Sequence, residues 1–233
     1  MITTAIVLSA LELGCIYALV AMALFLSFRV LNIADMTTDG AFTLGCAVSA
    51  TMAVAGHPIL GLFAAMVSGA AAGFVTAFLQ TRMGVPSILA GIITNTGLYT
   101  INLAVMGFSS NVPMLKTETV FTLLRGVAGE RFPYKLVLAG GISPDMVRAS
   151  SINTAFTVTV GLCIANAMTA LSGAVLAQYQ KSADINLGTG MVVIGLASLI
   201  IGETLFGHGG LWTKAVAAVA GSIIYRFIIA IAM

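Results

Sequence analysis

The chain has 233 residues, of which 59% are hydrophobic and 8% are charged, and its mean hydropathy is +1.08. Soluble domains carry about 25% charged residues, so this composition excludes an ordinary soluble protein and indicates one that crosses a membrane several times. The net charge of +2 is too small and too dispersed along the chain to indicate nucleic-acid binding.

The cysteines and histidines predict neither a disulfide framework nor a metal site. Cys15, Cys46 and Cys163 lie within apolar runs and lack CxxC spacing, so we interpret them as packed free thiols. His57 and His208 have no companion at a ligand spacing. We therefore expect no metal and no other cofactor.

The first apolar run, 5–28, predicts a membrane-spanning helix of about 36 Å at the helical rise of about 1.5 Å per residue. It has no basic leader and no clear cleavage signal, so we expect a retained helix. The run contains Glu12. A lone carboxylate at membrane depth costs about 2.5–3.5 kcal/mol. Glu12 is therefore expected either to face the bundle interior, on a translocation path, or to lie near the interface.

A polar break, 29–45, follows without room for a long loop. It carries four candidate path residues, which are Asp35, Thr37, Asp39 and Thr43. Polar groups at membrane depth persist only where protein or a water-filled path surrounds them, and a Gly-containing break between apolar runs is typical of a discontinuous helix at a translocation site. The alternative is a short hairpin loop at the membrane surface.

Further apolar runs bring the expected number of helices to about seven: 40–56, 58–79, 86–106, 155–178, 191–206 and 211–233. Gly69 and Gly73 form a GxxxG spacing, which lets a neighbouring helix approach closely. Thr94, Asn95 and Thr96 interrupt the third of these runs. They could join helices or line a path, and joining helices is the commoner use.

Residues 107–143 carry dispersed charges and two prolines, so we expect an extramembrane or interfacial segment. A short surface helix is predicted at 144–153, with Ser143 as its N-cap. One face of this helix is a narrow apolar stripe with charged residues at its edge. The helix could be a docking surface for a partner or an ordinary loop helix. The residues of interest are Pro144, Asp145, Met146, Arg148 and Ile152.

A second polar, Gly-containing break occupies 183–190 and includes Asn186; it leads into the short run 191–206, which contains Glu203. Two interrupted segments in corresponding halves point to a transporter site, and we add Asn186 and Glu203 to the candidate path. The predicted fold is an all-α, polytopic transmembrane helical bundle with two interrupted-helix half-repeats, forming a single domain over 1–233.

Several stretches together resemble a known family. They include Asp39-Gly-Ala-Phe-Thr-Leu-Gly45 and the segments 11–19, 27–31, 144–153 and 194–203. In order and spacing these are similar to the permease subunits of bacterial ABC importers, within the branched-chain amino acid and ribose permease superfamily. They are most similar to its tryptophan/tyrosine-type (aromatic amino acid) branch.

The resemblance implies a multi-pass protein of the bacterial plasma (inner) membrane that imports a small, amino-acid-like solute. Residues 144–153 would then be the coupling helix that docks on a cytoplasmic ATP-binding subunit, with a second permease copy and an extracytoplasmic solute-binding protein completing the assembly. The chain has no phosphate-binding GxxxxGK[ST] motif, so it is not expected to be an enzyme, and ATP hydrolysis would belong to the partner.

The residues alone are also compatible with two other functions. One is a stand-alone secondary carrier that uses Glu12, Asp35 or Asp39 for proton coupling, and the other is a degenerate, non-transporting membrane subunit. The superfamily also normally has a span just before the coupling helix, whereas 118–142 is short and charged. If 86–106 runs outward, one more crossing is needed to bring Arg148 to the cytoplasmic side.

Overall fold

The computed structural model describes residues 4–115, 117–122, 154–206 and 211–232. Within these ranges it contains α1 (Thr4–Leu24), the π-helical segment η1 (Phe25–Val30), α2 (Thr38–Val54), α3 (Pro58–Thr81), α4 (Ser87–Val105), β1 (Asn111–Pro113), α7 (Thr154–Gln180), β2 (Ser182–Asp184), α8 (Met191–Phe206) and α9 (Leu211–Ala232). The predicted all-α bundle is confirmed, with a short two-stranded sheet added.

Five of these helices are long and apolar enough to cross a membrane: α1 continued by η1, α3, α4, α7 and α9. The other two helices, α2 and α8, have 17 and 16 residues and are shorter. Each of the short helices follows one of the two polar breaks. The interrupted-helix pattern expected from the sequence is therefore present.

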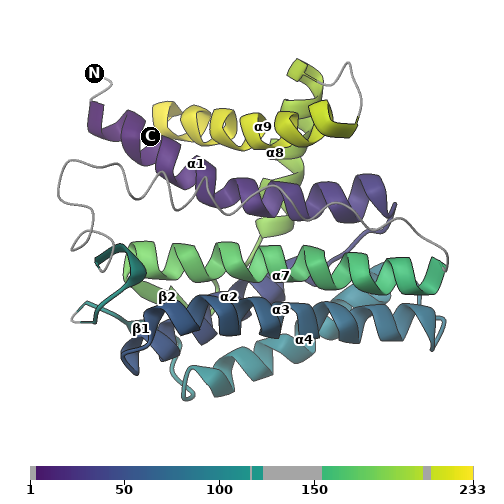
Figure 1. Cartoon of the computed structure of the whole chain (residues 1–233), viewed down its shortest axis with the longest axis horizontal. Coiled ribbons are helices and arrows are strands. Elements are labelled where there is room, and N and C mark those ends of the chain that lie inside the picture. The colour runs from purple at the N-terminus through teal and green to yellow at the C-terminus, as the bar shows by residue number, and fades with distance from the viewer. Residues whose placement is uncertain (1–3, 116, 123–153, 207–210, 233) are drawn as a thin grey trace.

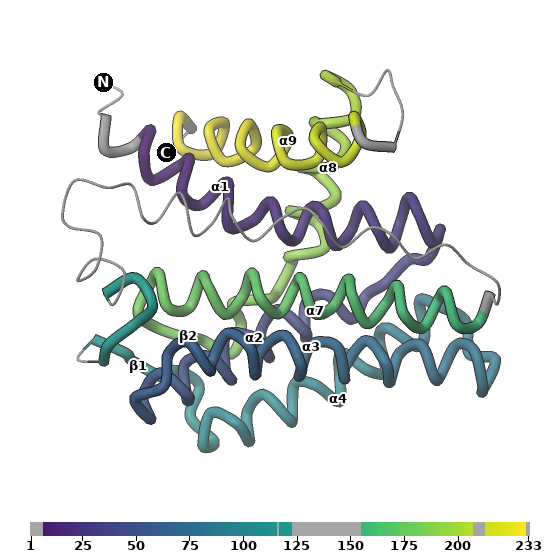
Figure 2. Tube along the Cα trace, viewed as in Figure 1, coloured from purple at the N-terminus to yellow at the C-terminus, as the bar shows by residue number. Residues whose placement is uncertain are grey.

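The helices lie side by side in two layers, with α1 and α9 on one side and α7, α3, α4 and the shorter α2 on the other (Figure 1). α7 packs against α3, α2 and α1, while α9 packs against α8 and α1. α8 crosses between the layers, and the tube view shows it passing from the region of α2 and β2 toward α9 (Figure 2).

Small residues allow α7 to pack closely on its neighbours. A Cβ at Gly45 of α2 would overlap the carbonyl of Ala170, and one at Gly173 of α7 would overlap the carbonyl of Phe42. A Cβ at Gly69 would lie 2.5 Å from the Asn166 carbonyl oxygen. Gly73 meets α7 in the same way, so the expected use of the GxxxG spacing for close helix approach is confirmed.

The first break begins where the first span ends in a π-helical segment. The Leu31 amide donates to the Leu26 carbonyl at 3.0 Å, and Ile33 donates to Ser27 at 2.9 Å. Asn32 then adopts a φ of +55°, a left-handed conformation that asparagine tolerates and that ends the helix. Residues 31–37 lead from this point into α2 without regular structure.

The ends of the helices fix the direction of the chain through the bundle. α3 and α7 run antiparallel, because Gln178 hydrogen-bonds the Pro58 carbonyl at one end while Leu162 lies against Gly73 toward the other. β1 pairs with β2, so α4 and α7 finish at the same end. Thr122 and Thr154 therefore lie at opposite ends of the bundle.

The described part of the segment 107–143 packs against this end of the bundle. The Val120 amide donates to Gln178 Oε1 at 2.8 Å, and the Phe121 and Tyr179 rings meet edge to face with centroids 5.9 Å apart. Residues 116 and 123–143, as well as the predicted coupling helix 144–153, lie outside the described residues.

Candidate functional site at the two helix breaks

The two breaks meet at Asp39, in the first turn of α2. Its carboxylate accepts hydrogen bonds from the amides of Gly190, at 3.1 Å, and Val192, at 2.9 Å, which flank the start of α8. The first amides of a helix have no partner within the helix, and a carboxylate at this position also interacts favourably with the helix dipole. Asp39 therefore caps a helix more than 150 residues away in the sequence and joins the N-terminal ends of both short helices.

Thr43, one turn further along α2, extends this junction. Its hydroxyl donates to the Asp39 carbonyl at 3.1 Å and accepts from the Gly188 amide at 3.1 Å. Gly188 lies so close that a Cβ there would overlap the Asp39 carbonyl. The second break is thus held directly against the first turn of α2.

A polar cavity of about 410 Å³ opens beside this junction. Asp39, Gly40 and Thr43 contribute from α2, and the second break contributes Ile185, Asn186, Gly188 and Thr189. The third wall is α4, through Asn95, Thr96, Tyr99, Thr100 and Asn102. The structure brings together three of the residues that the sequence predicts for a path: Asp39, Thr43 and Asn186.

Asp35 and Thr37 lie outside this cavity, in a buried network between α2, α3 and α7. Asp35 accepts from the Thr37 amide at 2.8 Å and from Asn166 Nδ2 at 2.7 Å, and its exposed fraction is 0%. The hydroxyls of Thr37 and Thr76 lie 2.8 Å apart. These contacts fasten the irregular segment before α2 to the two long helices behind it.

Glu12 faces protein rather than open surface. Its carboxylate accepts a hydrogen bond from the Tyr179 hydroxyl at 2.8 Å, and the residue is 9% exposed. Tyr179 is the penultimate residue of α7, so the pair lies near one end of the bundle. Glu12 is therefore held against protein near one end of the bundle, at a point separate from the cavity.

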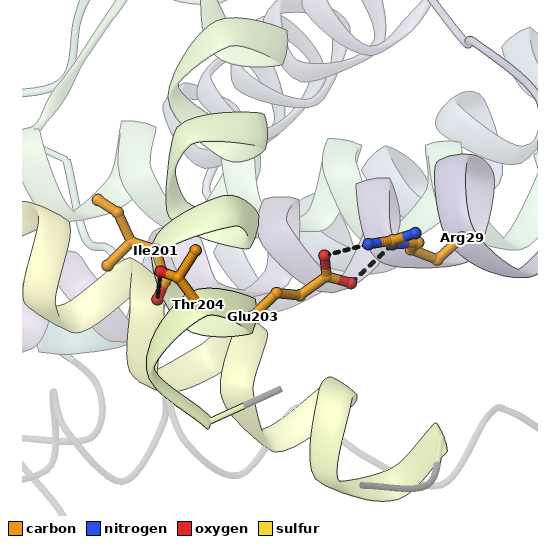
Figure 3. A network of polar contacts seen from close by, with 4 residues as sticks. All are labelled: Arg29, Ile201, Glu203 and Thr204. Atoms are coloured by element: carbon orange, nitrogen blue, oxygen red, sulfur yellow. Dashed lines mark hydrogen bonds and ion pairs between the residues drawn. The ribbon is translucent and has the colours of Figure 1, made fainter. Parts of the chain in front are cut away.

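Glu203 forms an ion pair with Arg29, which lies at the end of η1 (Figure 3). Arg29 Nε donates to Glu203 Oε1 at 2.7 Å, and a second nitrogen of the same guanidinium contacts Oε2. The Arg29 side chain is 53% exposed and that of Glu203 is 15% exposed. The pair joins the first break to the C-terminal half of α8.

The wall supplied by α4 was not predicted as part of a site. Only Thr94, Asn95 and Thr96 stood out in the sequence, with joining of helices as the commoner interpretation. Thr94 does bond its own helix, at the Ala90 carbonyl, but Asn95 and Thr96 line the cavity. Polar residues at 95, 99 and 102 follow the i, i+4, i+7 spacing of one helix face, and this periodicity could have identified the wall.

Comparison with known proteins adds family information to this geometry. Residues 6–129 match the family described as "Branched-chain amino acid transport system / permease component". A tyrosine transport system permease protein of Clostridioides difficile (strain R20291) is 31% identical over 97% of this chain and 83% of its own length. The uncharacterized protein RP368 of Rickettsia prowazekii (strain Madrid E) is 29% identical over 86% of this chain and 78% of its own. No solved structure matches.

Proposed function

This chain belongs to the family of permease components of branched-chain amino acid transport systems, and we propose on that premise that it forms the solute path of an ATP-driven importer. The family is a transporter family of multi-pass membrane proteins, not a catalytic one. Within it, we assign the path to the cavity beside Asp39.

The observation that carries this proposal is the meeting of the two breaks. Short helices that begin inside the bundle, with their N-terminal ends directed at one polar cavity, are the arrangement that transporters use for solute sites. Asp39 holds α8 in place while Thr43 and Asn186 line the same space. An irregular, polar backbone at this depth is stable only beside a water-filled cavity or within protein.

A second copy of the chain would complete the cavity. Thr96, Tyr99 and Thr100 are exposed on α4, a helix of membrane-spanning length. Polar side chains on such a helix are costly against lipid, so they favour a face that lies on a path between two copies. We therefore propose a dimer of permeases with the cavity opening onto the space between them.

The remaining assignments follow from the resemblance and the relatives. We propose a cytoplasmic ATP-binding subunit as the source of energy and an extracytoplasmic solute-binding protein as the source of solute. The bacterial inner membrane is the proposed location. The name of the Clostridioides difficile relative supports an amino-acid-like solute, with tyrosine as the first compound to test.

The coupling residues provide the test of this function. Met146→Glu would place a carboxylate in the apolar stripe of 144–153, and burying an unpaired charge against a partner is strongly unfavourable. We expect this variant to lose co-purification of the ATP-binding subunit and ATP-driven uptake, at unchanged membrane expression. Loss of the burial of one apolar side chain costs about 1.5–3 kcal/mol. This lowers the affinity for the ATP-binding subunit tenfold or more.

Ser151→Glu is the matched control, because position 151 lies on the opposite side of the predicted helix and should leave binding intact. Uptake and co-purification by Met146→Glu at the level of the unmodified chain would contradict the coupling assignment. Failure of the unmodified chain to bind any ATP-binding subunit from its own source would contradict the importer itself.

A further inference from the structure

One buried polar atom at the cavity lacks a partner among the residues that the structure describes. Asn102 is 1% exposed and lies in the cavity wall. Its Nδ2 donates to the Gly40 carbonyl at 3.2 Å, but its Oδ1 accepts no hydrogen bond from the described part of the chain. An unpaired buried acceptor costs about 1–3 kcal/mol, so a hydrogen-bond donor would be stabilised at this atom once the Asn102 side chain turns toward the cavity.

The side-chain amide of a second asparagine, Asn95, also lies against Gly40. A Cβ at residue 40 would lie only 2.5 Å from Asn95 Oδ1 and 3.1 Å from Leu98 Cβ. Glycine at this position therefore leaves room for α4 to bring Asn95 next to α2. Asn95 and Asn102 contact Gly40 from one side, and Asp39 is its neighbour in the chain.

The formal charge of the side chains that line the cavity is negative. Among the described residues that line it, Asp39 is the one acidic side chain, and neither lysine nor arginine is present. Its two carboxylate oxygens accept one amide each, whereas a carboxylate offers about four acceptor sites. Tyr99 adds an aromatic ring to the lining, and aromatic faces attract cations.

We propose that Asp39, Asn95 and Asn102 form a subsite for the protonated amine of a small solute. The inference rests on the proposed function, because it places the subsite on the solute path. Three acceptors and one negative charge suit a group with three N–H donors and one positive charge. An anion would meet a carboxylate and unpaired acceptors, and a neutral hydroxyl would leave the charge without a counter-ion.

Three aromatic compounds that differ in the head group test this selectivity: 2-phenylethylamine, 2-phenylethanol and 3-phenylpropionate. The purified full chain in detergent is titrated with each, and binding is measured as the increase in the midpoint of thermal unfolding. We expect the amine to raise the midpoint and the alcohol and the carboxylate to leave it unchanged.

Substitution at Asn95 separates binding from folding, because this residue is half-buried and Asn95→Asp removes no hydrogen bond found in the structure. Asn95→Asp should strengthen amine binding about tenfold by adding a second negative charge, and Asn95→Lys should abolish it. Asn102→Leu removes the unpaired acceptor together with the bond to the Gly40 carbonyl, and it should weaken amine binding about tenfold. Asn111→Asp and Asn111→Lys, on exposed β1, are the matched controls and should bind the amine as the unmodified chain does.

Equal stabilisation by the alcohol, or by sodium or potassium chloride at the same concentration, would overturn the amine subsite. Unchanged amine binding in both Asn95 variants would overturn it as well. These results do not depend on any partner subunit. Loss of the importer function would instead appear as failure to bind an ATP-binding subunit, with the selectivity of the isolated chain unaltered.

Discussion

At the scale of single residues, two carboxylates four positions apart have different roles. Asp35 lies in the irregular segment before α2, fully buried and bonded to Thr37 and Asn166. Asp39 lies inside the helix, partly exposed, where it caps α8 and lines the cavity. The i, i+4 spacing would place both on one face of a regular helix, but the chain becomes helical only at Thr38. The helix boundary therefore separates a structural carboxylate from a cavity carboxylate.

The Arg29–Glu203 pair gives a prediction at this scale. Its two-pronged contact joins η1 to α8, and each of Arg29→Gln and Glu203→Gln should lower stability by about 0.2–1 kcal/mol, since the arginine is exposed. The double charge reversal Arg29→Glu/Glu203→Arg should recover most of the loss. Thermal unfolding of the singles and the double in detergent measures the coupling.

The neighbouring Thr204→Val is the control, because the Thr204 hydroxyl bonds the Ile201 carbonyl of its own helix at 3.0 Å (Figure 3). Additive effects of the two charge changes, with no recovery in the double reversal, would show that the ion pair does not connect the two elements.

At the scale of elements, the position of α2 depends on its close approach to α7. Gly45 and Gly173 face the partner backbone at the points of contact, and Cys46 Sγ donates to the Gly173 carbonyl at 3.1 Å. Ser49 donates to the Ala174 carbonyl at 3.3 Å one turn later. Because α2 starts at the cavity, any displacement from α7 would also move Asp39. The shape of the site therefore depends on packing further along the same helix.

This gives a prediction with a matched pair of glycines. Gly45→Ala would force a methyl group into the Ala170 carbonyl and should destabilise the protein by about 1–3 kcal/mol or more. Gly97→Ala, on α4, meets no heavy atom of the described residues within 4 Å of the new Cβ and should raise stability by about 0.5–1 kcal/mol, because alanine favours the helix. The comparison is made by thermal unfolding of the two purified variants; equal stability would contradict the tight α2–α7 contact.

At the scale of the whole molecule, the bundle has two distinct ends. β1, β2 and the last turn of α7 mark one end, and the turn after α3 lies at the other, near the start of α7. Arg82 caps α3 at this second end. Positively charged residues favour the cytoplasmic side of a membrane protein, so this end is the expected cytoplasmic face.

Cysteine labelling in intact cells tests this arrangement, after replacement of the three native cysteines. Met83→Cys, at an exposed site after α3, should be protected from an impermeant reagent, whereas Ser109→Cys, before β1, should be labelled from outside. Ser151→Cys, just before α7, should behave as Met83→Cys does. Labelling of Met83→Cys and Ser109→Cys from the same side would contradict the crossing of the membrane by α4.

The sequence by itself determined the class of the protein, its apolar helices and the places where they break. These properties are local, because a bilayer selects long apolar runs and excludes unpaired polar backbone whatever the neighbouring helices are. Most of the fold could therefore be predicted, including the short helices after 29–45 and 183–190. The family could be recognised for the same reason, since motif order along the chain needs no contact information.

Only the tertiary structure decided which polar residues share a site. Asp35 and Asp39 look alike in the sequence, and the contacts with Asn166 on one side and with the amides of α8 on the other distinguish them. The sequence does not mark Asn102 as a site residue, because the burial of its unpaired oxygen results from the packing of α4 against Gly40. Such contacts join residues 62 to 153 positions apart, and they depend on packing between helices that no local pattern encodes.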